Sequence, residues 1–149
     1  MRIPDILAER QVHFETNVHP PAFTAQKRAR FLHLPGAQVA KCVLLIGSAG
    51  RFLAVLPATK HIDMERLVHL LGGPVRVADS EEVADTFPDC EWGVVAPFGT
   101  LYGIPTLIDE SLSPDSPIVL EISTHAEAIR MRCRDFEQLE QPRRLRFTM

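Results

Sequence analysis

The sequence predicts an α+β fold in which one bent mixed β-sheet is covered by helices packed outside it. Apolar stretches of strand length alternate irregularly with segments that carry helix caps and helical spacing, as expected when helices cover a sheet. The chain has 149 residues, 46% hydrophobic and 23% charged, which is the composition of a folded domain. No repeat or linker divides it, so residues 1–149 are predicted to form a single domain.

The N-terminal part of the chain predicts two helices and an extended segment between them. A helix is expected over residues 3–14, because Pro4 is tolerated in a first turn and apolar residues fall on neighbouring rows. Residues 14–19 are expected to be extended, and the two prolines that follow end this segment. Thr24 is a good N-cap for a second helix that reaches Leu32 and ends before Pro35.

The middle of the chain predicts a hairpin followed by two capped helices. Residues 39–46 and 52–56 flank a Gly-Ser-Ala-Gly turn, and both are apolar on both faces, which indicates two central strands. Asp63 is expected to cap a helix over 64–71 that two glycines close. A short strand over 75–78 and a helix over 81–87, capped by Ser80, are expected next.

The C-terminal part predicts a structured loop, two strands and a last helix. Residues 92–105 hold three glycines and two prolines among apolar residues, which indicates a buried loop that leads into a strand. Strands are expected over 106–108 and 118–122, and a helix over 134–139. Residues 128–133 fit either a helix or a strand.

Charge is unevenly distributed along the chain, although the formal net charge is only -3. Residues 1–76 carry ten Lys or Arg against five acids, residues 77–129 carry eleven acids and no Lys or Arg, and residues 130–149 carry six Arg against three acids. This asymmetry permits a basic face that suits a polyanion, unless folding intermixes the segments. The C-terminal arginines would contact the phosphates of a polyanion if they share a face with the site, and would otherwise form a solvated end of the chain. They are Arg143, Arg144 and Arg146.

The sequence predicts a cytoplasmic protein without a metal or cofactor. Three cysteines lie about forty residues apart and the histidines lack the spacing of zinc ligands. No apolar stretch approaches the ~20 residues that span a bilayer, so no membrane partner is expected. The first five residues lack the apolar run of a signal peptide.

Lys41 is the most informative residue, because every other position of residues 39–46 is apolar. An ammonium group is rarely buried without a partner, since its desolvation is costly. A cavity that opens at Lys41 would explain its place, and a lysine that reaches water from a strand end is the alternative. The loop from Gly93 to Gly99 is a second candidate, since its free N–H groups would hold an oxyanion, unless it is a plain packing turn.

Several segments in order resemble the YbaK/prolyl-tRNA-synthetase-associated domain family. They are Val39-Ala40-Lys41 at the start of an apolar strand, Leu56-Pro57-Ala58 at the end of its hairpin partner, and Gly93 before Pro97-Phe98-Gly99. The likeness extends from about Pro20 through residues 134–139. Members are typically freestanding or synthetase-inserted editing domains that hydrolyse the ester of a wrongly charged tRNA, and their bent mixed sheet agrees with the fold predicted above.

The resemblance implies roles for particular residues. Lys41 would hold the phosphate or carbonyl region of the tRNA acceptor end, and N–H groups around Gly99 would meet the oxyanion. The substrate-binding residues are expected to be Thr24, Pro97, Phe98 and His125. His125 is similar in place to a histidine that lines the amino-acid pocket of related editing domains, and an exposed loop histidine is the alternative.

Cys42 departs from the family and suggests a rival reaction. Some alanine-specific members have asparagine after the lysine, so the cysteine argues against alanine specificity. A thiol hydrolase would use Cys42 as nucleophile with a histidine base. Alternation along a strand, however, points Cys42 away from Lys41 into a second apolar layer.

The sequence therefore predicts an aminoacyl-tRNA deacylase for a small amino acid, with water as nucleophile and without metal or cofactor. An aminoacyl ester is already activated, so positioning and electrostatic stabilisation suffice. The expected partner is the tRNA acceptor end, and an aminoacyl-tRNA synthetase is a further partner that stays open. A second hypothesis is a binding protein that holds an aminoacyl group or nucleotide without hydrolysis, which turnover would distinguish.

Overall fold

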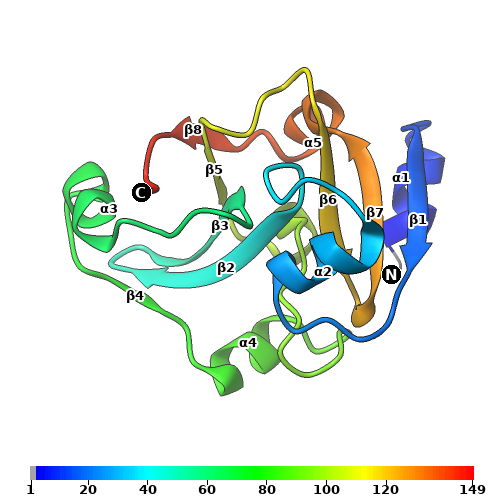
Figure 1. The fold of residues 1–149 in the computed structure, drawn as a ribbon. Helices are drawn as coiled ribbons and strands as arrows, with labels where there is room; N and C mark the ends of the chain where they lie inside the picture. The colour runs from blue at the N-terminus through cyan, green and yellow to red at the C-terminus, as the bar shows by residue number, and fades with distance from the viewer. Residues whose placement is uncertain (1–2) are drawn as a thin grey trace.

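The computed structural model describes residues 3–149 and shows an α+β fold with two β-sheets (Figure 1). The larger sheet has five strands in the order β4-β2-β3-β5-β8, and it is mixed because β5 runs parallel to both of its neighbours. Its strands are β2 (Ala40–Gly47), β3 (Gly50–Pro57), β4 (Val75–Val77), β5 (Thr106–Asp109) and β8 (Arg143–Leu145). The predicted fold class and the central β2–β3 hairpin are confirmed.

The strands that were expected in one bent sheet are divided between two sheets. The smaller sheet is antiparallel, in the order β1-β7-β6, and consists of β1 (Phe14–Val18), β6 (Pro117–Ile122) and β7 (Thr124–Arg132). A parallel bridge between Val39 and Val119 joins β6 to the start of β2, and the Val119 N–H donates to Gln38 O at 3.0 Å. The two strands diverge beyond this bridge, which is why the ladder does not continue as one sheet.

Within residues 3–149, five α-helices cover the sheets, and one short 3₁₀ helix interrupts the loop before β5. They are α1 (Ile3–Glu9), α2 (Ala25–Leu32), α3 (Met64–Leu71), α4 (Ser80–Thr86), α5 (Cys133–Glu140) and the 3₁₀ helix η1 (Gly99–Tyr102). The predicted caps of α2 and α3 are present, since Thr24 and Asp63 accept hydrogen bonds from backbone N–H groups of the first turn. Within residues 3–149 no helix is long and apolar enough to cross a membrane.

Four local expectations are corrected or resolved. Helix α1 ends at Glu9 rather than at residue 14, because Gln11 has a positive φ of 59° that a right-handed helix cannot hold. The N-cap of α4 is Asp79 rather than Ser80, and its carboxylate accepts from the Glu82 N–H at 2.8 Å. The ambiguous residues 128–133 belong mainly to β7, and residues 143–145 form β8 instead of a solvated tail.

The core has two main parts. One fills the space between the two sheets, and the other covers the opposite face of the larger sheet. Val55 and Ile108 of the larger sheet, Ile118 and Leu120 of the smaller sheet, and Phe136 of α5 are buried together. A second apolar cluster packs α3 against the other side of the larger sheet and contains Leu45, Leu56, Leu67 and Phe147. The sheets are thereby fixed at the angle that opens a fork between β2 and β6.

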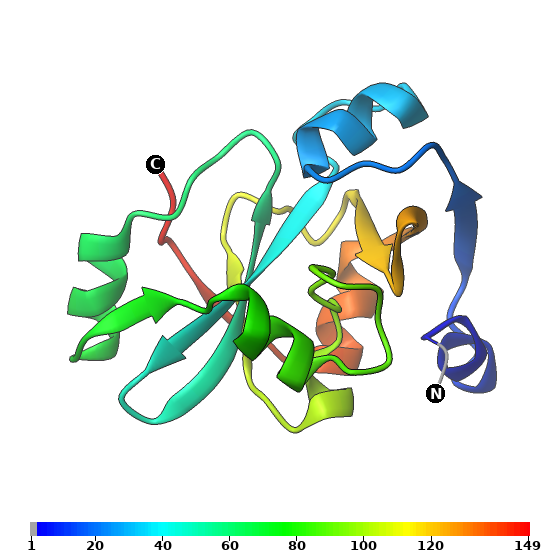
Figure 2. The ribbon, with the colours of Figure 1, turned by 90° about the horizontal axis from the view of Figure 1, so that it is seen from below.

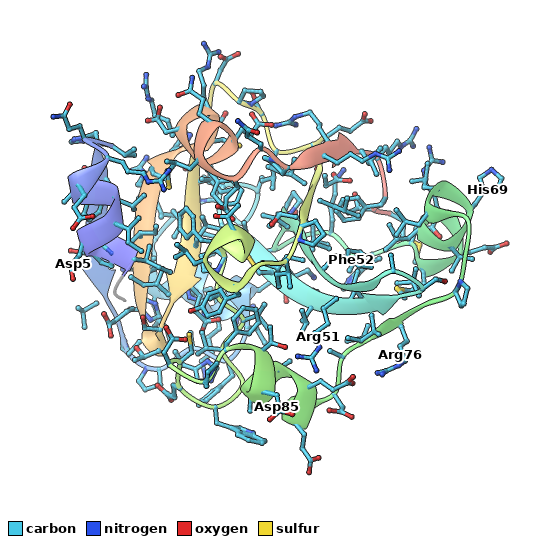
Figure 3. The ribbon with its side chains drawn as sticks, turned by 180° about the vertical axis from the view of Figure 1, so that it is seen from behind. Asp5, Arg51, Phe52, His69, Arg76 and Asp85 are labelled. Carbon is cyan, nitrogen blue, oxygen red and sulfur yellow. The ribbon has the colours of Figure 1, made fainter. Side chains whose placement is uncertain are left out.

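Polar contacts fix α4 to strands β3 and β4 of the larger sheet. Figure 3 shows Arg51, Arg76 and Asp85 near one another where β3, β4 and α4 meet. The Arg51 guanidinium donates to Thr86 Oγ1 at 2.6 Å, and Arg76 forms an exposed ion pair with Glu82 at 2.7 Å. This corner holds one ion pair and one hydrogen bond, and it lies away from the fork.

Candidate active site

A cavity of about 290 Å³ opens in the fork between β2 and β6. The strands meet at the Val39–Val119 bridge and separate beyond it, so residues that follow the bridge on each strand face one another across a gap. Helix α2 lies beside this gap (Figure 2). The lining residues come from α2, β2, β6, the 93–95 loop and the β6–β7 turn: Phe23, Thr24, Ala25, Gln26, Arg28, Ala40, Lys41, Cys42, Val43, Ala58, Gly93, Val95, Glu121 and His125.

The cavity follows an edge of β2 that no strand covers. Strand β4 pairs only with residues 45–47 of β2, and the Ala78 N–H donates to Leu44 O just before that stretch. Residues 40–43 therefore have β3 on one side and the cavity on the other. Because the cavity lies at an edge, it receives side chains from both faces of the strand. Lys41 and Cys42 thus both line this space, and Cys42 also packs against the apolar cluster between the sheets, as strand alternation predicts.

Thr24 has a structural task at the entrance. As N-cap of α2 its Oγ1 accepts from the Lys27 N–H at 3.1 Å, so the hydroxyl fixes the direction of the helix. Phe23, directly before the cap, is 72% exposed, and its ring lies 4.7 Å from the ring of His125. The cap thereby holds an exposed aromatic ring at the rim of the cavity.

A buried charge network forms one wall of the cavity. Arg28 Nη2 and His125 Nδ1 both lie 2.9 Å from the same atom, Glu121 Oε1. Arg28 also donates to Ala22 O at 3.2 Å and is only 2% exposed. Burial lowers the pKa of Arg28, and burial raises the pKa of Glu121 against the opposing effects of Arg28 and His125.

His125 ties this network to the neighbouring loop. Its Nε2 lies 2.9 Å from Trp92 O, and a carbonyl only accepts, so Nε2 carries a proton that it donates. Its Nδ1 faces the Glu121 carboxylate. Ser123, with a positive φ of 52°, makes the tight turn between β6 and β7 that brings Glu121 and His125 to one end of the hairpin. His125 is 7% exposed, so it is a fixed wall residue.

Lys41 presents an ammonium group that no carboxylate neutralises. In the part of the chain that the structure describes, no acidic side chain lies within ion-pair distance of its Nζ. Desolvation lowers the pKa of Lys41, which is the expected effect of partial burial without a counter-ion. A cation held in a cavity in this way is suited to an anionic ligand.

The thiol of Cys42 is a poor nucleophile in this place. Burial, with Glu121 adding to it, raises the pKa of Cys42 to about 12. Since the thiolate is the reactive form, the thiol-hydrolase reaction has no support from the chemistry of this site.

We expect Cys42 to react with iodoacetamide at pH 8 about 10³-fold more slowly than a thiol of ordinary pKa, because its thiolate fraction falls by about that factor. Labelling followed by mass spectrometry of the Cys42 peptide measures the rate, and the unfolded protein in urea is the reference. Rapid labelling of the folded protein together with an inactive, well-folded Cys42→Ala variant would restore the thiol hypothesis.

Three predicted site residues lie outside the cavity. Phe98 packs on Phe136 in the core with 5.4 Å between ring centroids, and Pro97 is buried beside it in the chain. Gly99 is buried, and a Cβ there would come within 2.6 Å of Ile104 O. The N–H groups of Gly99 and Thr100 donate to the Glu140 carboxylate, so Gly99 does not offer its amide to the cavity.

Gly93, at the other end of the same loop, is the glycine that lines the cavity. It has a positive φ of 87°, and a Cβ there would lie 3.5 Å from His125 Nε2. Among residues 3–149, no acceptor receives the N–H groups of Gly93 and Val95. The sequence pattern contained both glycines, and the choice of Gly99 over Gly93 could be made only from the backbone path. Arg28 and Glu121 were also missed, since neither stands in a motif.

Comparison with known proteins shows which family the chain belongs to. The model of the aminoacyl-tRNA editing domain matches residues 19–139, which include every residue of the cavity. The chain belongs to the aminoacyl-tRNA editing domain family. An editing domain hydrolyses aminoacyl-tRNA esters, so the chain is an aminoacyl-tRNA deacylase that acts on tRNA. No curated protein sequence matches the chain.

Solved structures share the fold of this editing domain. "Hypothetical protein APE2540" superposes with a TM-score of 0.88 at 17% identity, over 100% of both chains. A "putative trans-editing enzyme for prolyl tRNA synthetase" superposes with a TM-score of 0.87 at 23% identity, over 99% of this chain and 95% of that one. A "putative signal transduction protein" from Marinobacter aquaeolei VT8 has a TM-score of 0.72 at 19% identity, and the match covers 91% of this chain and 28% of that one.

The C-terminal arginines of the editing domain lie far from its cavity. Strand β8 is at the opposite edge of the larger sheet from the uncovered edge of β2. Arg144 forms an ion pair with Glu137 and donates to the carbonyls of Glu110 and Leu112, so it is a structural residue. The hypothesis that Arg143, Arg144 and Arg146 share a face with Lys41 is therefore not supported by their positions.

Proposed function

We propose that this editing domain hydrolyses, in trans, the ester of a tRNA mischarged with a small amino acid. The observation that carries the proposal is the cavity of about 290 Å³ with the uncompensated Lys41 ammonium in its wall. This volume lies at the lower end of the range for small-molecule sites, which suits a small aminoacyl group. A wall that limits side-chain size acts as the second sieve of editing.

The chemistry requires positioning rather than a strong acid or base. Lys41 binds the terminal phosphate or the ester region by a charge-assisted contact. The free N–H groups of Gly93 and Val95, rather than that of Gly99, stabilise the oxyanion that forms on the carbonyl. Water attacks the carbonyl carbon, the bond to the ribose oxygen breaks, and the neighbouring ribose hydroxyl assists in activating the water. Amino acid and tRNA leave as products, and the step uses no metal or cofactor.

Exposed aromatic rings at the rim suit the terminal adenosine. Phe23 is 72% exposed, and Trp92, next to Gly93, is 63% exposed. Bases stack on exposed aromatic side chains without regard to sequence, which fits the invariant end of every tRNA. His125 would form the wall that contacts the side chain of the amino acid. Thr24 would act indirectly, because its N-cap fixes the direction of α2. A synthetase partner would supply the specificity for one tRNA, and a cytoplasmic location follows from such a function.

A panel of mischarged tRNAs tests the proposal. The editing domain is incubated with tRNAs that carry glycine, alanine, serine, cysteine, threonine and leucine, and the loss of the ester is followed in time. We expect hydrolysis of one or more small esters and none of leucyl-tRNA. Saturable binding without release of amino acid would instead indicate a binding protein, and hydrolysis that does not depend on size would contradict the sieve.

The tRNA is expected to approach over α2. Arg30 lies one helical turn after the cavity residue Gln26, and Lys27 directly follows Gln26 in the chain. Helix α2 contains no acidic residue. Helix α4 (Figure 1), by contrast, carries the acids Glu81, Glu82 and Asp85 and no Lys or Arg, so its surface is less suited to phosphates.

Replacing Lys27 and Arg30 by glutamine is expected to make the dependence of tRNA affinity on salt less steep. Each phosphate contact contributes about 0.7 to 0.9 to the slope of log K against log salt, so the slope should fall by about 1 to 2. Arg143→Gln together with Arg146→Gln removes the same charge at the far edge and should leave the slope unchanged. The reverse ranking of the two variants would place the tRNA on β8.

A further inference from the structure

Glu121 is unusual among the residues of the cavity, because no other acidic side chain of residues 3–149 lines it. One carboxylate oxygen, Oε1, receives both Arg28 and His125 at 2.9 Å. The other oxygen, Oε2, has no hydrogen-bond partner in the described chain, and the side chain keeps 18% of its surface exposed. The protein thus holds one carboxylate oxygen rigidly and leaves the second one open to the cavity.

The position of this open oxygen matches the charges of an aminoacyl ester. Such a substrate has anionic phosphates on the tRNA side and one cation, the α-ammonium of its amino acid. The cavity has a free cation, Lys41, on β2 and a free carboxylate oxygen on β6, which are the two arms of the fork. Opposite charges at opposite arms fix the direction in which the ester lies, because the reversed direction would bring like charges together.

We propose that Glu121 Oε2 accepts a hydrogen bond from the α-ammonium of the aminoacyl group and makes the editing domain selective for esters with a free amino group. This inference rests on the proposed function, since it names a feature of the same substrate. Peptidyl, N-acylated and 2-hydroxyacyl esters lack the cation and are disfavoured. For the ammonium, Arg28 and His125 act as positioning residues, because they hold Oε1 and thereby direct Oε2.

A purely structural role for Glu121 leads to a different expectation. If the carboxylate served only to neutralise Arg28, its loss would affect all ligands alike. Recognition of the ammonium predicts a loss confined to ligands that carry this cation. A charged hydrogen bond contributes about 1.5 to 3 kcal/mol, which corresponds to an affinity ratio of roughly 10 to 100.

The test compares two stable analogues of the acceptor end, 3′-alanylamido-3′-deoxyadenosine and its lactylamido counterpart, which replaces the amino group by a hydroxyl of similar size. Their affinities for the wild type and for Glu121→Gln are measured by NMR titration, with the exposed Glu65→Gln as control. We expect the wild type and the control to bind the amino form about 10- to 100-fold more tightly, and Glu121→Gln to bind both forms within about threefold.

Three results would overturn the inference: a wild type that binds both analogues equally, a preference that survives in Glu121→Gln, or no binding of either analogue at millimolar concentration. Because both ligands are compared on one protein, a partly unfolded variant changes both affinities equally and leaves their ratio intact. The analogues are not hydrolysed, so a failure of the proposed deacylation would appear in the tRNA panel and not here.

Discussion

Lys41→Met is expected to lower kcat/KM for deacylation by about 10²- to 10³-fold while the protein remains folded. Lys41 is a free cation in the wall of the cavity, and its ammonium has no acidic partner in the described chain that its loss would leave unpaired. Removal of one electrostatic contact in a partly dry site raises the barrier by roughly 3 to 4 kcal/mol. Methionine keeps most of the apolar stem, so the strand retains its packing.

Single-turnover deacylation of the ester that the tRNA panel identifies measures this effect. Lys60→Met, which removes a lysine that does not line the cavity, is the matched control and should retain activity. Circular dichroism and a urea titration establish that both variants are folded. Near wild-type turnover by Lys41→Met would mean that Lys41 only reaches water from the strand, and the proposed mechanism would then fail.

The elements that could be predicted from the sequence are those with local signals. Three helix ends lie where the pattern indicated. Thr24 and Asp63 cap their helices through side-chain hydrogen bonds, and Gly72 ends a helix with a positive φ. The β2–β3 hairpin was likewise visible as two apolar runs around a glycine-rich turn. The division into two sheets was not predictable, because it depends on where β6 leaves β2, and no local pattern records a long-range register.

The candidate site was predicted in part for the same reason. Lys41 could be found because a charge within an apolar strand is a local anomaly. Alternation placed Cys42 correctly in the apolar layer between the sheets, but it does not show whether the edge of β2 is covered, so the contact of Cys42 with the cavity was missed. Arg28 and Glu121 are 93 positions apart and look like ordinary surface residues, so their 2.9 Å contact is visible only in the fold. The choice between Gly93 and Gly99 needed the loop path.

Arg28→Met is expected to be the most destabilising single change in the cavity wall, with a loss of about 3 kcal/mol in the free energy of unfolding at neutral pH. Arg28 is 2% exposed, so its guanidinium lies within the protein and neutralises a carboxylate that is itself largely buried. Without it, Glu121 keeps only His125 as a partner, and an incompletely paired carboxylate remains in a desolvated place. Arg30→Met, an exposed arginine of the same helix, should change stability little.

The loss in the free energy of unfolding caused by Arg28→Met should increase as the pH rises. Burial already raises the pKa of Glu121 above its ordinary value of 4.5, and Arg28 opposes this rise, so removal of Arg28 raises the pKa further. A carboxyl group whose folded-state pKa lies above the unfolded value stabilises the protein below the unfolded pKa, and this stabilisation is lost as the pH rises through the folded pKa. The variant should therefore be closest to the wild type at acidic pH and fall behind it as the pH approaches neutrality.

Urea unfolding over a pH series measures this difference, and the double variant Arg28→Met/Glu121→Leu decides its cause. Replacing a whole buried ion pair by apolar side chains is often nearly neutral, whereas removing one partner is not. The double variant should therefore recover most of the stability lost in Arg28→Met and show a weaker dependence on pH. A deficit that does not change with pH, or a double variant less stable than Arg28→Met, would assign the loss to the packing of α2, and the Arg28–Glu121 pair would then have no part in holding the carboxylate in place.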